Sequence, residues 1–77
     1  MAIDDGPIID ILYRRGPLST GTIGADLGDQ VEATEVEAQL VDMQNRQLTE
    51  ESEALPRRWQ LTERGAQLGR ERKARSS

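Results

Sequence analysis

Hydrophobic residues in the first part of the chain recur at helical spacing. Ile8, Ile11 and Leu12 fall at i, i+3 and i+4, so they share one face of a helix. Pro7 suits the first helical position, and Gly16 followed by a proline stops a helix. The pattern predicts a helix over about residues 7–15 whose apolar stripe packs into the core.

A second, shorter helical pattern follows, and Leu18 before it is predicted to add a short strand to a later hairpin. Ser19 or Thr20 can serve as the N-cap of this helix, and Ile23 and Leu27 lie on one side of it. Gly28 then ends the helix. A third helix is predicted over about residues 34–46, because Val36, Leu40 and Met43 lie at i, i+4 and i+7.

The period changes to that of a strand after residue 47. Trp59 and Leu61 alternate with Arg58 and Gln60, which places the first two on a core and the others outside. A polar loop carrying the run Leu55-Pro56-Arg57 precedes this strand, and Leu48-Thr49 precedes the loop. The pattern predicts a β-hairpin, followed by a helix that Thr62 can cap.

The order of these elements resembles the winged helix-turn-helix family. The strongest likeness is an aromatic residue, one spacer and Leu-Thr-x-x-Gly, which here reads from Trp59 to Gly65. The resemblance covers about residues 8–69 and is closest to small archaeal regulators of the phage-repressor-like and MarR-like type. It implies an α+β fold with a three-helix core, a two-stranded wing hairpin and a C-terminal helix.

The length of 77 residues allows one domain, with a core of about residues 7–69 and a basic tail over 70–77. The chain has no Cys and no His, so thiolate chemistry, imidazole catalysis and the usual zinc sites are excluded. The acidic run Glu50-Glu51-Ser52-Glu53 lies in the predicted hairpin, where such runs are usually solvated. We therefore expect no enzyme, no cofactor and no metal site.

No run of about 18 apolar residues occurs, and Met1–Asp5 lacks the basic, apolar opening of a signal peptide. We therefore expect a cytoplasmic protein that does not enter a membrane. Charge is unevenly spread within the net value of −4. Residues 29–56 are acidic and contain Arg46 as their one basic residue, whereas residues 57–77 are mostly basic.

In the family that the chain resembles, the third helix enters the major groove and the wing contacts the backbone. The resemblance therefore implies a DNA-binding transcriptional regulator that docks on duplex DNA. The predicted DNA contacts lie on the third helix, on the wing and at the end of the first helix, and they are Thr34, Asn45, Arg46, Arg57, Arg58 and Arg14.

Two features depart from the family pattern. The outward face of the third helix includes Glu35 and Asp42, which phosphates repel. This acidity reflects either a high-salt cytoplasm or loss of DNA binding. If DNA binding is lost, the alternative function is a protein-interaction module whose acidic third helix binds a basic partner. The second departure is Gln47, where the family commonly has Gly; Asn45 could take the left-handed conformation instead.

A homodimer is also expected. Leu68 offers an apolar contact on the last helix, and the arginine-rich end of that helix could meet acidic residues such as Glu50 and Glu51 of a second copy.

Overall fold

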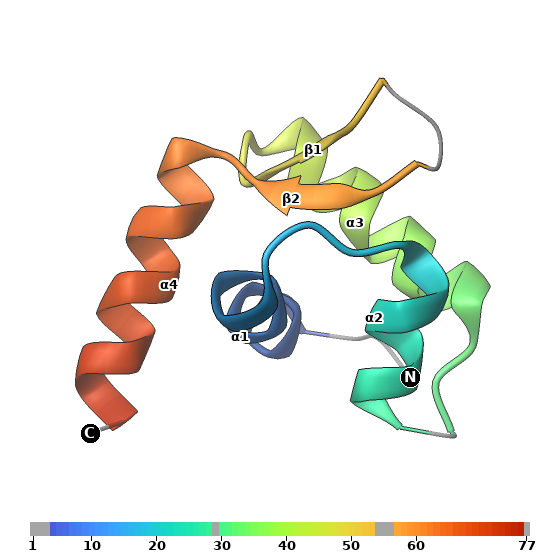
Figure 1. Cartoon of the computed structure of the whole chain (residues 1–77), viewed down its shortest axis with the longest axis horizontal. Helices are drawn as coiled ribbons and strands as arrows, with labels where there is room; N and C mark the ends of the chain where they lie inside the picture. Colours follow the sequence, from blue (N-terminus) through green and yellow to red (C-terminus); the bar gives the residue numbers. More distant parts are fainter. Residues whose placement is uncertain (1–3, 29, 54–56, 77) are drawn as a thin grey trace.

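The computed structural model describes residues 4–28, 30–53 and 57–76. Its elements are α1 (Asp5–Arg15), α2 (Thr20–Leu27), α3 (Ala33–Asn45), β1 (Thr49–Glu51), β2 (Trp59–Leu61) and α4 (Glu63–Ser76). Figure 1 shows α1 at the centre, with α2 and α3 on one side, α4 on the other and the hairpin across the top. The predicted α+β layout, with a three-helix core, a two-stranded wing and a C-terminal helix, is confirmed.

The start of α1 differs from the prediction. The helix begins at Asp5, with Asp4 in extended conformation as its N-cap, so Pro7 is the third helical residue and not the first. The first four N–H groups of a helix have no partner within it, so a proline costs no hydrogen bond anywhere in that first turn. The end is as predicted: Gly16 adopts a φ of 83° and its N–H donates to the Leu12 carbonyl over 2.9 Å.

The short helix α2 is capped as the sequence predicts. The Ser19 hydroxyl accepts a hydrogen bond from the Thr22 N–H over 3.3 Å, and Gly28 ends the helix at a φ of 126°. The next helix, α3, begins at Ala33, one residue before the predicted start, and ends at Asn45.

The hairpin pairs β1 with β2 in antiparallel register, with Thr49 opposite Leu61 and Glu51 opposite Trp59. Leu18 adds a bridge to this sheet: its N–H donates to the Trp59 carbonyl over 3.0 Å, and the Trp59 N–H donates back over 2.7 Å. The strand predicted at Leu18 is thus present as a single bridge. The predicted loop residues 55 and 56 lie outside the described part of the chain.

Trp59 holds the sheet against the helices, as its alternation with Gln60 predicts. It is 3% exposed and belongs to the same buried cluster as Ile8, Leu12, Leu40 and Met43, while Leu61 packs against that cluster and is partly buried. The indole Nε1 donates to the Thr20 hydroxyl over 3.2 Å, so the polar atom of this large side chain is also satisfied.

The Leu-Thr-x-x-Gly run joins the wing to α4. The Gly65 N–H donates to the Thr62 hydroxyl over 3.1 Å, which confirms Thr62 as the cap, and the Thr62 N–H donates to the Leu48 carbonyl over 3.1 Å. A Cβ on Gly65 would lie 2.1 Å from that same carbonyl oxygen. Glycine is therefore required here, because the helix packs directly on the backbone that enters β1.

The exit from α3 uses a left-handed residue that is not glycine. Gln47 has a φ of 65° and is the sole non-glycine residue with positive φ in the described ranges. Asn45 is the last residue of the α3 helix, so the alternative in which Asn45 takes the left-handed conformation is wrong. The left-handed position at which the resemblance predicts glycine is thus occupied by a residue with a Cβ.

Candidate nucleic-acid interface

The outermost ridge of α3 consists of small, uncharged side chains. Thr34, Ala38, Val41 and Asn45 follow one another at i, i+4, i+7 and i+11, which places them along one face opposite buried Val36, Leu40 and Met43. All four are exposed, and Val41, at 42%, is the exposed large hydrophobic residue of the described structure. We call these four residues the α3 ridge.

Acidic side chains flank the α3 ridge. Glu35 and Asp42 lie on one side of it and Glu37 on the other, and all three are exposed. The helix itself, from Ala33 to Asn45, contains no basic residue. The ion pairs between described residues are made by aspartates, and none includes a glutamate. Glu35 and Glu37 therefore have no ion-pair partner among the described residues, whereas Asp42 pairs with Arg46.

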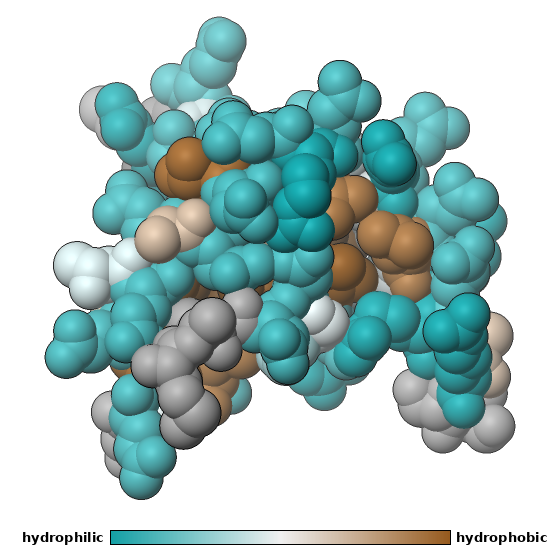
Figure 2. Space-filling model, turned by 180° about the vertical axis from the view of Figure 1, so that it is seen from behind, coloured by the Kyte–Doolittle hydropathy of each residue, from teal (hydrophilic) through white to brown (hydrophobic). Residues whose placement is uncertain are grey.

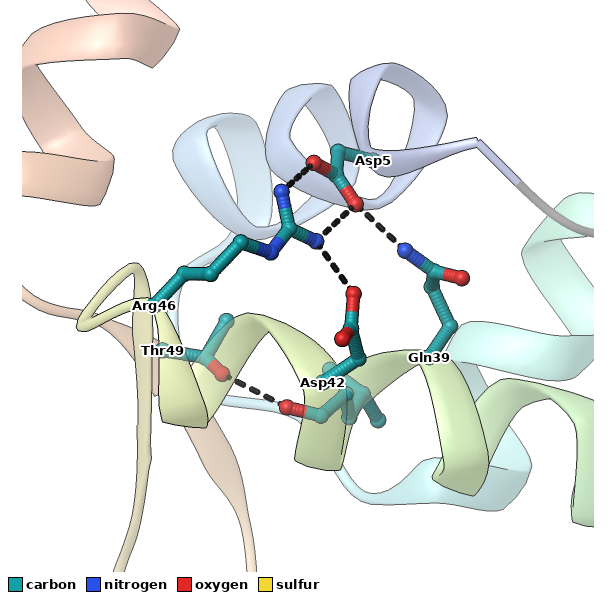
Figure 3. Close-up of polar contacts among 6 residues, drawn as sticks. Asp5, Gln39, Asp42, Arg46 and Thr49 are labelled. Carbon is teal, nitrogen blue, oxygen red and sulfur yellow. Dashed lines mark hydrogen bonds and ion pairs between the residues drawn. The ribbon is translucent and has the colours of Figure 1, made fainter.

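Arg46, at the end of α3, is bound by two carboxylates (Figure 3). Its Nη2 donates to an Asp5 oxygen and to an Asp42 oxygen, each over 2.7 Å, and its Nη1 donates to the second Asp5 oxygen. Gln39 Nε2 also donates to Asp5, so α1 and α3 are joined at the start of α1. We call these four side chains the Asp5–Arg46 network.

The hydrogen bond from Arg46 holds the pKa of Asp5 below its ordinary value, although burial acts in the opposite direction. The same contact raises the pKa of Arg46. Arg46 was predicted as a DNA contact, and the structure places its guanidinium between two carboxylates instead of free on the surface. The sequence contains the i, i+4 spacing of Asp42 and Arg46, but no local signal points to Asp5, 41 residues away.

The wing carries acidic residues on β1 and basic residues just before β2. Arg57 and Arg58 are exposed and directly precede β2, and the Arg58 carbonyl accepts a hydrogen bond from the Ser52 N–H over 2.8 Å. Across the hairpin, Glu50 accepts a hydrogen bond from Gln60 over 2.6 Å. The predicted wing contacts are thus both available, and the strand beside them is acidic.

Arg14, near the end of α1, lies beside α4. It lines a shallow groove with Asp10, Tyr13, Gly69 and Lys73, and its Nε donates to the Asp10 carbonyl over 3.3 Å. The predicted DNA contacts therefore fall into three places, namely α3, the wing and the α1–α4 groove. The wing contacts α3 through β1, and it contacts α1 and α4 through β2.

The predicted basic tail continues α4 to Ser76, and it is tied to α1. Arg72 Nε donates to one Asp10 oxygen over 2.9 Å, and Nη2 donates to the other over 3.1 Å. This contact lowers the pKa of Asp10, against the effect of burial, and raises the pKa of Arg72. A further pair, Arg15 with Asp26, joins α1 to α2. No local pattern in the sequence indicates either pair, because the partners are 62 and 11 residues apart.

Hydrophobic side chains appear as small, separate groups on the face of the molecule shown in Figure 2. A shallow groove runs between α4 and the turn after α3, lined by Arg46, Leu48, Arg64, Gln67, Leu68 and Glu71. Among the described residues, no group of three or more Asp or Glu side chains is arranged to hold a metal ion. None of the described helices is long and apolar enough to span a membrane.

No protein-family model matches the chain, and no curated protein matches it in sequence. Among solved structures, the chain is similar to a mutant of ZitR from Lactococcus lactis, with a TM-score of 0.75 and 19% sequence identity. The match covers 96% of this chain and 52% of that one, so this chain spans about half the length of its structural neighbour. At this identity the likeness supports the winged-helix fold.

Proposed function

We propose that this chain is a DNA-binding transcriptional regulator. In this proposal α3 lies in the major groove of duplex DNA with the α3 ridge toward the base edges, and Arg57 and Arg58 contact phosphates from the wing. The observation that carries it is that a winged-helix fold exposes both the α3 ridge and two wing arginines. The likeness to ZitR supports the fold on which the proposal depends.

We expect the wing to supply most of the electrostatic attraction to DNA. Phosphates repel Glu35 and Asp42, and Arg46 is neutralised by Asp5 and Asp42. Arg57 and Arg58 are exposed and have no ion-pair partner among the described residues. We therefore expect weak, wing-dependent binding, in which screening by salt reduces both the attraction and the repulsion.

The test is duplex binding across a salt series from low to molar potassium chloride. Arg57→Ala and Arg58→Ala should each weaken binding about equally on different sequences, and each should reduce the salt slope by about one counterion. Arg70→Ala removes an exposed arginine from α4 and is the matched control, because it should change neither quantity. Glu35→Gln should strengthen non-specific binding. Unchanged slopes in both wing variants would contradict this mode of docking.

Glu35 and Glu37 flank the α3 ridge and have no ion-pair partner among the described residues. They favour a second candidate function, a protein-interaction module that binds a basic partner through α3. This candidate predicts that Glu35→Gln abolishes capture of the partner, whereas Arg57→Ala has little effect. It also predicts that no duplex binds at any salt concentration. The two functions therefore give opposite results for the same pair of variants.

Three finer points belong to the same proposal. We propose a cytoplasmic location, a specific relationship to archaeal phage-repressor-like and MarR-like regulators, and weak self-association through α4. Leu68 is partly buried against the core of its own chain, so a dimer contact there would depend mainly on the charged residues around it. Light scattering at high protein concentration, with and without added salt, tests the association.

A further inference from the structure

The shape of the α3 ridge suits close approach to base edges. Its four side chains are no larger than valine, so the α3 backbone can lie near whatever the ridge contacts. From Thr34 to Asn45 the ridge extends about 16 Å along the helix, at about 1.5 Å per residue. That length matches about five base pairs at about 3.4 Å each.

The chemistry of the ridge and its flanks disfavours guanine. The commonest specific contact to guanine is a bidentate pair from Arg or Lys to its N7 and O6 acceptors. No Arg or Lys lies within α3, and Arg46 at its end is bound by Asp5 and Asp42 (Figure 3). The carboxylates of Glu35 and Asp42 only accept hydrogen bonds when ionised, so they cannot supply the donors that guanine N7 and O6 require.

The same chemistry favours thymine. Ala38, Val41 and the methyl group of Thr34 are the exposed apolar groups of the ridge, and apolar side chains in the major groove contact the C5-methyl group of thymine. Val41 is the central case, because it exposes 42% of its surface to water without any described partner that would cover it. Contact with a methyl group would remove this apolar surface from water.

We propose that the α3 ridge selects duplexes that present pyrimidine C5-methyl groups in the major groove, with Val41 and Ala38 as the specificity-determining residues. This inference rests on the proposed DNA-binding function and adds the class of sequence that is read. Asn45, at the C-terminal end of the ridge, can pair with adenine N6 and N7, which fits the partner base of a thymine.

Synthetic duplex polymers test the proposal without knowledge of an operator. The probes are alternating adenine–thymine and adenine–uracil DNA duplexes, which differ in the C5-methyl group, and alternating guanine–cytosine duplexes with and without 5-methylation of cytosine. The wild-type chain should bind the methylated member of each pair about fourfold more tightly per contacted methyl group. Val41→Ala should reduce this ratio toward one. It should stay folded, because the site is exposed and alanine favours helix.

Gln44→Ala is the matched control, since Gln44 is exposed on the same helix but lies off the ridge. It should keep the wild-type ratio, as should Arg58→Ala, which should weaken binding to all four polymers together. Equal binding to the methylated and unmethylated members would overturn the methyl readout while leaving DNA binding intact. Binding to none of the polymers from low to molar salt would overturn the DNA-binding function and the readout with it.

Discussion

At the scale of single residues, the turn after α3 has a left-handed residue that is not glycine. The departure at Gln47 suggested a changed exit from the helix, with Asn45 as the alternative left-handed residue. The structure keeps the turn, because the Leu48 and Gln47 N–H groups donate to the carbonyls of Met43 and Gln44 over 2.9 Å each. Those hydrogen bonds, and the start of β1 that follows, favour the left-handed conformation at Gln47 despite its Cβ.

Gln47→Gly should therefore stabilise the domain. Glycine adopts a φ of 65° without the steric cost that Gln47 bears, and part of this gain is lost to the greater freedom of glycine in the unfolded chain. We expect an increase of about 0.5–1 kcal/mol in the free energy of unfolding, measured by urea titration. Gln44→Gly, the same substitution within α3, should decrease it by about half a kcal/mol. A decrease in the Gln47 variant would show that the strain assigned to this position is absent.

At the scale of elements, the sequence predicted those features that residues close together along the chain determine. Apolar spacing predicted α1, α2 and α3, and the alternation around Trp59 predicted the strand and its buried face. The caps at Ser19 and Thr62 could be predicted because each hydroxyl accepts a hydrogen bond from the N–H three residues later. Contacts between distant segments could not be predicted in this way: the pair of Asp5 with Arg46 spans 41 residues and the pair of Asp10 with Arg72 spans 62.

The same reason explains the mixed result for the predicted DNA contacts. The exposed character of Thr34 and Asn45 followed from the helical period of α3. The position of Arg14 depended on how α4 packs on α1, which the period of either helix alone does not determine. The partner of Arg46 on α1 is Asp5, which the helical period of α3 does not indicate. Binding roles for all six predicted residues stay predictions.

The Asp5–Arg46 network should make stability depend on pH in acid. Arg46 lowers the pKa of Asp5 in the folded chain. The ionised Asp5 therefore contributes fully to the free energy of unfolding above the pKa that Asp5 has in the unfolded chain, and this contribution is lost as pH falls through its folded pKa. Asp5→Asn should therefore lower the Tm at pH 7, and the difference from wild type should shrink below about pH 4. Thermal unfolding followed by circular dichroism between these limits measures the difference.

Asp4→Asn is the control for that measurement, because Asp4 is the exposed neighbour of Asp5 and makes no ion pair among the described residues. It removes the same charge near the start of α1 without removing the contact to Arg46. If both variants lower the Tm by the same amount at pH 7, the effect comes from charge at the helix terminus and not from the Asp5–Arg46 network.

At the scale of the whole molecule, two sets of charges respond to salt in opposite directions. The described ion pairs are partly exposed, with at least 28% of each side chain accessible, and such pairs contribute little and weaken when screened. The exposed glutamates of α3 and β1 have no ion-pair partner among the described residues, and the chain carries a net charge of −4. Screening reduces their mutual repulsion, which favours the compact state.

We expect the repulsion to dominate, so the Tm should rise with potassium chloride from about 0.1 M into the molar range. A variant that combines Glu35→Gln, Glu37→Gln and Glu50→Gln should have a higher Tm than wild type at low salt and a flatter dependence on salt. The matched variant Glu63→Gln, at the start of α4 where a carboxylate favours the helix dipole, should not raise the Tm. A wild-type Tm that falls steadily with salt would mean that the ion pairs dominate. The acidity of α3 would then not be explained by adaptation to a saline cytoplasm, and selection against DNA or for a basic partner would be the stronger account.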